Sequence, residues 1–211
     1  VSNTISDSEG VVVVTVSKVQ QRREAKVALI VEAAWDLARR DGITQVSMRD
    51  LAKAVGMRQP SLYAYFDSKN ALYDDMFADG NRQLVAVLSA LELPADPRAA
   101  LKTALKAFAD FAVSDAARYS LLFTRVIPGF EPSAPSYAIA QDVLSRMVAI
   151  MSAAGVTDPG DVDCLVAMTA GLIDAQLSND PGGTRWLQHL DRMTDLLVDN
   201  AISATNTRST P

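Results

Sequence analysis

The sequence predicts an all-α fold with a small N-terminal head and a larger C-terminal body. Of its 211 residues, 49% are hydrophobic but only 6% are aromatic, and Ala and Leu are plentiful, a composition that favours helices over sheets. Apolar residues also recur at helical spacing through long segments that Pro and Gly separate. We therefore expect a flexible arm over residues 1–17, a head over 18–72, a body over 73–204 and a flexible tail over 205–211.

The chain opens with a polar stretch over residues 1–10. Residues 11–16, VVVVTV, have the β-branched composition of a strand but no obvious partner, and we assign them no role. The first helix is predicted over residues 19–40, where Val27, Ile30 and Ala34 fall on one face.

Residues 47–72 predict two short helices joined by a tight turn, with a third helix directly after. Ser47 and Asp50 form a capping pair that starts a helix near residue 48. Gly56 can adopt the left-handed conformation that ends a helix. Pro60 suits the first turn of a second helix beginning near residue 58 or 59, and Asp67 or Ser68 caps the third.

The second of these helices has a sharply divided surface. Leu62 and Phe66 take its inward positions, and the residues expected to point outward are Arg58, Gln59, Ser61, Tyr63 and Tyr65. A short helix with such a polar and aromatic face, following a tight turn, is typical of a helix-turn-helix whose second helix lies in the DNA major groove.

Charge is unevenly divided along the chain. Residues 18–69 hold ten Lys or Arg against six Asp or Glu, a net of +4, although the whole chain carries −5. A basic head on an acidic body favours DNA binding and orients the approach to it.

Residues 27–72 resemble the DNA-binding domain of the TetR family of bacterial transcriptional regulators. The resemblance lies in an Ala-rich first helix, a Gly-Ile-Thr corner at 42–44, and the motifs at 49–52, 55–57, 62–66 and 68–72. The run over 59–63, QPSLY, is particularly similar to the recognition helix of tetracycline repressors. Tyr65 stands where the family often has His, and Ala64 replaces a commonly bulky aromatic residue.

Chemistry and resemblance together give the head its predicted DNA contacts. Arg49 can fork onto guanine or a phosphate, and Gln59 can pair with adenine. Tyr63 and Lys69 resemble the phosphate contacts of the family. The full predicted set is Arg49, Arg58, Gln59, Ser61, Tyr63, Tyr65 and Lys69.

The third helix of the head continues to about residue 91, and the prolines at 94 and 97 mark the joint with the body. Five further helices are predicted over residues 97–113, 115–125, 136–154, 158–178 and from Thr184 onward. A Pro-rich linker over 128–135 and a Pro-Gly-Gly turn at 181–183 separate the later ones.

The last two long helices predict a dimer. Their apolar surfaces are wider than a single core stripe, and in TetR relatives the corresponding helices pair with their symmetry mates. The predicted interface residues are Leu165, Leu172, Ile173, Trp186, Leu190, Met193 and Leu197. Burial within one subunit is the alternative for some of them. Pairing would double the DNA contacts and match an inverted repeat.

The resemblance also implies an effector pocket in the body. Large rings and Met side chains alternate with small residues on the inward faces, which leaves room for an apolar molecule or packs as a solid core. The predicted lining residues are Phe108, Phe111, Tyr119, Phe123, Tyr137, Met147, Met168 and Gln176.

Several function classes find no support in the residues. With one His (His189) and one Cys (Cys164, expected in the core), no metal cluster, disulfide framework or Ser-His arrangement is expected, and we predict neither an enzyme nor a cofactor. We find no membrane span or signal peptide and expect a cytoplasmic protein.

The sequence therefore predicts a homodimeric repressor that a small apolar or aromatic ligand releases from a palindromic DNA operator. The alternatives are a ligand-independent regulator, an activator of the same fold, an α-helical enzyme, or a scaffold dimer.

Overall fold

The computed structural model describes residues 17–208, and these residues form nine α-helices and two short 3-10 helices with no strand. The all-α prediction is therefore confirmed. The predictions for residues 1–16, including the VVVVTV segment, and for residues 209–211 lie outside the described part of the chain.

The head begins with α1 (Lys18–Asp41), followed by a 3-10 turn (Ile43–Gln45). Two short helices, α2 (Met48–Ala54) and α3 (Gln59–Leu62), come next, and α4 (Lys69–Ser89) leads away from them. The regular part of the second motif helix is shorter than its sequence pattern suggests, because the chain turns after Leu62.

The body contains five helices, as predicted. They are α5 (Pro97–Ser114), α6 (Ala116–Phe123), α7 (Ala134–Ala153), α8 (Pro159–Asn179) and α9 (Leu190–Arg208). The last helix runs four residues beyond the boundary expected at residue 204.

Local capping explains where most of these helices start. A Ser or Asp side chain accepts a hydrogen bond from a backbone N–H of the first turn, which satisfies a donor that the helix itself leaves unpaired. The capping residues are Ser17, Ser47, Ser68, Asp96, Asp115, Ser133 and Asp158.

The predicted start of the last helix at Thr184 is wrong, since α9 begins at Leu190 after a 3-10 turn (Leu187–His189). Side chains of α8 explain the delay. Gln176 Oε1 accepts hydrogen bonds from the backbone N–H groups of Trp186 and Leu187, at 2.9 and 3.3 Å. These tertiary bonds hold the chain as a loop where a local pattern predicted a helix.

The two larger apolar cores of the described residues belong to the head and to the body, and a smaller cluster of Leu84, Phe111 and Val143 forms a third. The head core centres on residues that are almost inaccessible to solvent, among them Ile30, Trp35, Leu51, Leu62 and Phe66. It continues along α4 through Tyr73, Met76 and Phe77, and reaches Leu121 of α6. The body core joins α5, α7, α8 and α9. Since α4 and α6 contribute to the head core, the head and body are joined by packing as well as by the chain.

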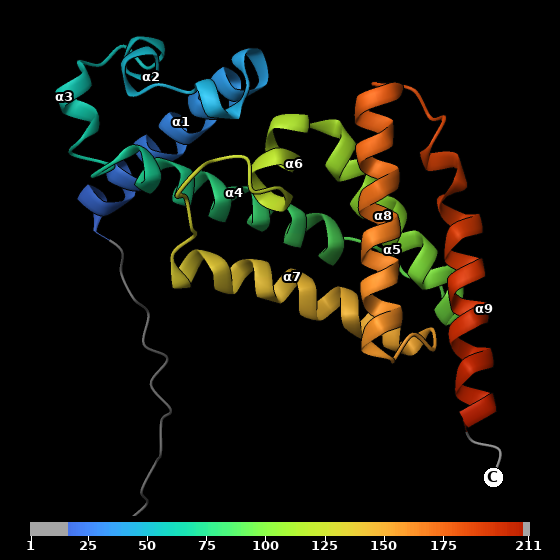
Figure 1. Cartoon of the computed structure of the whole chain (residues 1–211). Coiled ribbons are helices and arrows are strands. Elements are labelled where there is room, and N and C mark those ends of the chain that lie inside the picture. Colours follow the sequence, from blue (N-terminus) through green and yellow to red (C-terminus); the bar gives the residue numbers. More distant parts are fainter. Residues whose placement is uncertain (1–16, 209–211) are drawn as a thin grey trace, which may run out of the picture.

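The two ends of the molecule differ in character (Figure 1). At one end α2 and α3 stand out from α1, and at the other α8 and α9 lie side by side. Between them α4 and α7 run alongside each other. None of the described helices combines the length and the hydrophobicity that a membrane span requires.

Candidate functional site

The helix-turn-helix presents most of its predicted DNA contacts to solvent. Arg49, Arg58, Gln59 and Ser61 are exposed, and Tyr63 is 45% exposed. Leu62 and Phe66 are buried, at 0% and 1%, so the predicted inward positions are confirmed. Tyr65 and Lys69 are only partly exposed.

The turn between α2 and α3 has the expected geometry. Gly56 adopts a φ of +64°, the left-handed conformation that L side chains rarely adopt. The Met57 N–H then donates to the Ala52 carbonyl at 2.8 Å and closes the helix end. Arg58 caps α3 in an extended conformation, and Pro60 lies in its first turn. These residues fix the direction in which α3 leaves the head.

Arg23 is a functional candidate that the sequence reasoning missed. Its Nη1 donates to the Ala64 carbonyl at 2.9 Å, and its guanidinium lies 5.3 Å from the centroid of the Tyr65 ring. Both contacts hold the segment just after α3 against α1. The basic run at the start of α1 was the available signal, but only the fold reveals that it lies beside the recognition helix.

Lys69 also has a structural contact. Its Nζ donates to the Thr44 carbonyl at 3.3 Å and lies 5.2 Å from the centroid of Tyr73, whose hydroxyl donates to the Ile43 carbonyl at 2.9 Å. The start of α4 thereby holds the corner that leads into α2. An ammonium has three donors, so this bond leaves Lys69 able to contact a phosphate as well.

Polar contacts tie α1 to the helices of the body. Trp35 Nε1 donates to Asp79 Oδ2 of α4 at 2.9 Å, and Arg39 Nε donates to Asp115 Oδ2 at 2.8 Å. Asp115 is also the cap of α6, and its side chain is only 6% exposed. Side-chain hydrogen bonds therefore join both α4 and the start of α6 to the first helix of the head.

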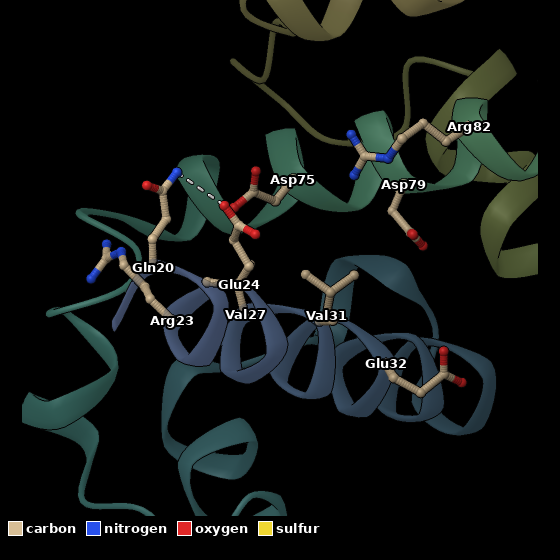
Figure 2. A pocket seen from close by; sticks show the side chains of 10 residues that line it. Gln20, Arg23, Glu24, Val27, Val31, Glu32, Asp75, Asp79 and Arg82 are labelled. Atoms are coloured by element: carbon tan, nitrogen blue, oxygen red, sulfur yellow. Dashed lines mark hydrogen bonds between the residues drawn. The ribbon is translucent and has the colours of Figure 1, made fainter. Parts of the chain in front are cut away.

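A groove of about 630 Å³ lies between α1 and α4 (Figure 2). Glu24 and Glu32 of α1 and Asp75 and Asp79 of α4 contribute four carboxylates to its walls, and two arginines line it as well. Burial raises the pKa of Asp75, with the neighbouring Asp74 adding to the shift. These charged walls distinguish the groove from the apolar pocket predicted in the body.

That apolar pocket lies among α4, α5, α6, α7 and α8 and has a volume of about 360 Å³. Its wall is formed mainly by aromatic, Leu, Val and Met side chains. Of the predicted ligand-binding residues, five line it: Phe108, Tyr119, Phe123, Tyr137 and Met147. Asn81 and Thr169 also line it and were not predicted from the sequence.

The other three predicted ligand residues are placed elsewhere. Phe111 lies under the guanidinium of Arg118, with 3.7 Å between the Arg118 Cζ and the ring centroid. Met168 packs against the body core. Gln176 is occupied with the loop before α9. Gly171, another small residue of α8, faces open space, since a Cβ at this position would meet nothing within 4 Å.

Two polar side chains of the pocket already have partners. Asn81 Nδ2 donates to the Phe77 carbonyl at 2.9 Å. Burial, together with a hydrogen bond to Asp174, raises the pKa of Tyr119, so its hydroxyl stays neutral at physiological pH. Within the described residues, no group of His, Cys, Asp and Glu is placed to hold a metal ion.

The predicted dimer residues are largely inside the chain. Leu165, Leu172, Ile173, Leu190 and Leu197 are all buried, and Trp186 and Met193 are partly buried against the same core. Burial within one subunit, the alternative that the sequence left open, therefore holds for these five buried residues, and the interface itself stays a prediction. Cys164, expected in the core, is exposed on the opposite face of α8.

Comparison with known proteins agrees with the geometry of the head. Residues 30–76 match the profile of bacterial regulatory proteins of the tetR family. A candidate mycofactocin biosynthesis transcriptional regulator, MftR, of Mycobacterium tuberculosis (strain ATCC 25618 / H37Rv) is 32% identical over 145 residues. That similarity covers 67% of this chain and 73% of the relative.

Solved structures share the fold over most of the chain. The TetR family transcriptional regulator PfmR from Thermus thermophilus superposes with a TM-score of 0.60 at 23% identity, covering 81% of this chain and 97% of that one. BioQ, solved with its double-stranded DNA operator, gives a TM-score of 0.58 at 19% identity, covering 84% and 98%. The chain belongs to the TetR family of DNA-binding bacterial transcriptional regulators.

Proposed function

We propose that the protein is a homodimeric repressor that binds an inverted-repeat operator and releases it when a small apolar molecule enters the body pocket. One observation carries the proposal. The helices α4 and α6 that wall the pocket are the same helices that contact α1 of the head. A ligand that prefers one arrangement of these helices would thereby shift the spacing of two heads on DNA.

A body that packed as a solid core, without a pocket, would support a regulator that does not respond to a ligand. A pocket of about 360 Å³ among five helices favours the ligand-responsive reading, because protein interiors otherwise pack with few voids larger than a water molecule. The volume lies near the lower end of the range for small-molecule sites, so the expected ligand is small.

In the DNA complex that we propose, α3 enters the major groove. Gln59 and Ser61 would reach base edges, while Arg49, Arg58, Tyr63 and Lys69 would contact bases or phosphates at the rim. The operator complex of the structural neighbour BioQ supports this use of the fold. Arg23 and Tyr65 would act by holding the end of α3 in place.

Arg58 and Gln59 offer a direct test of this interface. Arg58→Ala should weaken binding to all DNA sequences about equally and reduce the salt slope by about one, because a phosphate contact is lost. Gln59→Ala should instead alter the base preference at one operator position. The affinity ratio between the preferred base and the others at that position should change by roughly 5- to 150-fold. Operators selected from random sequence, with binding measured across a salt series, separate the two effects.

The matched control is Lys106→Ala, which removes an exposed cation from α5 in the body. Its operator affinity and salt slope should equal those of the unmodified protein. Binding that is independent of salt, or a Gln59→Ala protein with unchanged base preference, would contradict the proposed interface. Arg58 is preferred to Lys69 here because Lys69→Ala would also break the bond to Thr44.

Ala140 tests the pocket, because it lines the cavity from α7. Ala140→Phe should fill part of the space and weaken the binding of 2-naphthol, a small aromatic probe, by roughly 5- to 150-fold, the usual cost of overpacking. Operator affinity should remain unchanged. Calorimetry with the probe and a gel-shift titration give the two measurements.

Ala138→Phe is the control, since Ala138 is exposed on the same helix. It adds the same ring without entering the pocket and should leave probe binding intact. Equal probe binding by the two variants would place the binding site elsewhere and remove the ligand-responsive half of the proposal. A reporter gene placed behind the operator tests the repressor half of the proposal. The reporter should be silent when the protein is present and active when it is absent.

A further inference from the structure

We propose that the ligand is uncharged and carries a hydroxyl or carbonyl oxygen on its apolar body, and that the hydroxyl of Thr169 binds this oxygen. The inference rests on the proposed function, since it specifies the chemistry of the molecule that fills the body pocket. It assigns a hydrogen-bonding anchor to a wall of α8 that is otherwise apolar.

Thr169 is unusual because its hydroxyl has no hydrogen-bond partner among the residues that the structure describes. The residue is 3% exposed and lines the pocket, and its Oγ1 is buried without any hydrogen bond. Burying an unpaired hydroxyl costs free energy, so such groups are rare in folded proteins. A ligand that supplies the missing partner would recover that cost.

Other threonines of the same chain make a hydrogen bond to the backbone that Thr169 lacks. A helical threonine ordinarily donates to the carbonyl one turn earlier. Thr103 donates to Ala99 at 2.9 Å, Thr124 to Ser120 at 2.7 Å, and Thr194 to Leu190 at 2.9 Å. Thr169 makes no such bond. Turning its hydroxyl toward the pocket would therefore break no hydrogen bond.

The rest of the pocket restricts what the ligand can carry. None of the described residues that line it has a charged side chain. A carboxylate or an ammonium buried there would lose its hydration without gaining a counter-charge. Of the other polar residues in the wall, Tyr137 and Gln141 are exposed to solvent and Asn81 already donates to Phe77. Thr169 therefore supplies the buried hydroxyl of the wall that has no partner among the described residues.

In the described part of the chain, two other buried side-chain atoms lack partners, and they do not compete for this role. These are Arg118 Nε and Trp186 Nε1, and neither residue lines the pocket. Tyr137, Leu144 and Val166 also line the pocket but are 52%, 55% and 47% exposed, so they form an open apolar mouth. The apolar body of the ligand would lie against this mouth while its oxygen reaches Thr169.

A matched naphthalene series tests the anchor: 2-naphthol, 2-methylnaphthalene, 2-naphthoate and protonated 2-naphthylmethylamine. Calorimetry with the full chain should show that 2-naphthol binds best and that the two ions bind worst. Thr169→Val, which keeps the shape of the side chain, should weaken 2-naphthol binding by roughly three- to tenfold, the value of one hydrogen bond, and leave 2-methylnaphthalene unchanged. Thr169→Ser should retain 2-naphthol binding.

Thermal unfolding of the ligand-free protein gives a readout that needs no ligand. Thr169→Val should raise the unfolding midpoint, because it removes an unpaired buried hydroxyl. Thr194→Val is the matched control and should lower the midpoint, because that buried hydroxyl is paired with Leu190. A lower midpoint for Thr169→Val would show that its hydroxyl has a partner and would overturn the anchor.

The outcomes separate this inference from the proposed function. If 2-naphthol and 2-methylnaphthalene bind equally well, to the unmodified protein and to Thr169→Val, the anchor is wrong and the pocket stands. Tighter binding of 2-naphthoate than of 2-naphthol would likewise overturn it. If no member of the series binds, both the proposed ligand pocket and the proposed anchor are contradicted. Binding with the expected preference but without operator release would support the anchor and contradict the proposed response.

Discussion

Replacing Gly171 with arginine is expected to convert the proposed dimer into monomers and to lower operator affinity by on the order of 10³-fold. One recognition helix reads only a few base pairs, so specific binding requires two heads held at a fixed spacing. A monomer would retain the non-specific affinity, which is typically at least about 10³-fold weaker than specific binding.

The exposed face of α8 supplies the reason for choosing Gly171. Cys164, Ala167, Gly171 and Ser178 follow one another at intervals of three, four and seven residues and are all exposed. These small side chains allow a close approach of another helix, and on the adjoining α9 the apolar Leu196 is 60% exposed. We propose this face as the interface, which would bury about 2,000 Å² or more if the dimer is obligate.

Gly171→Arg separates dissociation from misfolding. A Cβ at this position meets nothing within 4 Å, so the arginine fits the folded monomer and clashes only with a partner. Charged substitutions at Leu172 or Leu190 would not make this distinction, because both side chains are buried in their own chain. Sedimentation should give a monomer for Gly171→Arg and a dimer for Ala149→Arg, a control at an exposed position on α7. A Gly171→Arg protein that remains a dimer would move the interface away from this face.

The head could be predicted from the sequence because its signals are local. Ser47 and Ser68 cap helices within their own first turns, and Gly56 ends α2 through its own backbone conformation. Each of these effects depends on residues at most five apart. The inward positions of Leu62 and Phe66 follow from the same short-range pattern.

The candidate site in the body was harder to predict from the sequence, because it depends on contacts between distant segments. Gln176 bonds to residues ten and eleven positions later, and Phe111 is covered by Arg118 from the next helix. A periodic pattern shows that these residues are inward without saying which ones border a void. Thr169 could not be found from the sequence either, since a missing hydrogen bond leaves no trace in the residue pattern.

Asp115→Ala is expected to destabilise the protein by about 2–3 kcal/mol. The carboxylate caps α6, a contribution of about 1 kcal/mol, and pairs with Arg39 at 2.8 Å while being only 6% exposed itself. Breaking a fully buried pair costs about 3–5 kcal/mol, but Arg39 is 40% exposed and keeps Glu32 and Asp36 as partners, so the loss here is smaller.

The measurement is the unfolding midpoint at a fixed protein concentration, because the stability of a dimer depends on concentration. For a chain of this size the expected fall is roughly 4–12 °C. Asp110→Ala is the control on the neighbouring turn of α5. It deletes a carboxylate whose pair with Lys106 is exposed on both sides, and should cost about 0.5 kcal/mol or less.

Asp115→Asn divides the effect into its two parts. Asparagine caps helices about as well as aspartate, so this variant should keep the cap and lose only the charge opposite Arg39. Its midpoint should lie between those of Asp115→Ala and the unmodified protein. Because the same pair joins α1 to α6, Asp115→Asn should also weaken the coupling between probe binding and operator release. A midpoint equal to that of the Asp110→Ala control would show that the buried contact contributes no more than a surface pair, and that α6 is not held to the head through Asp115.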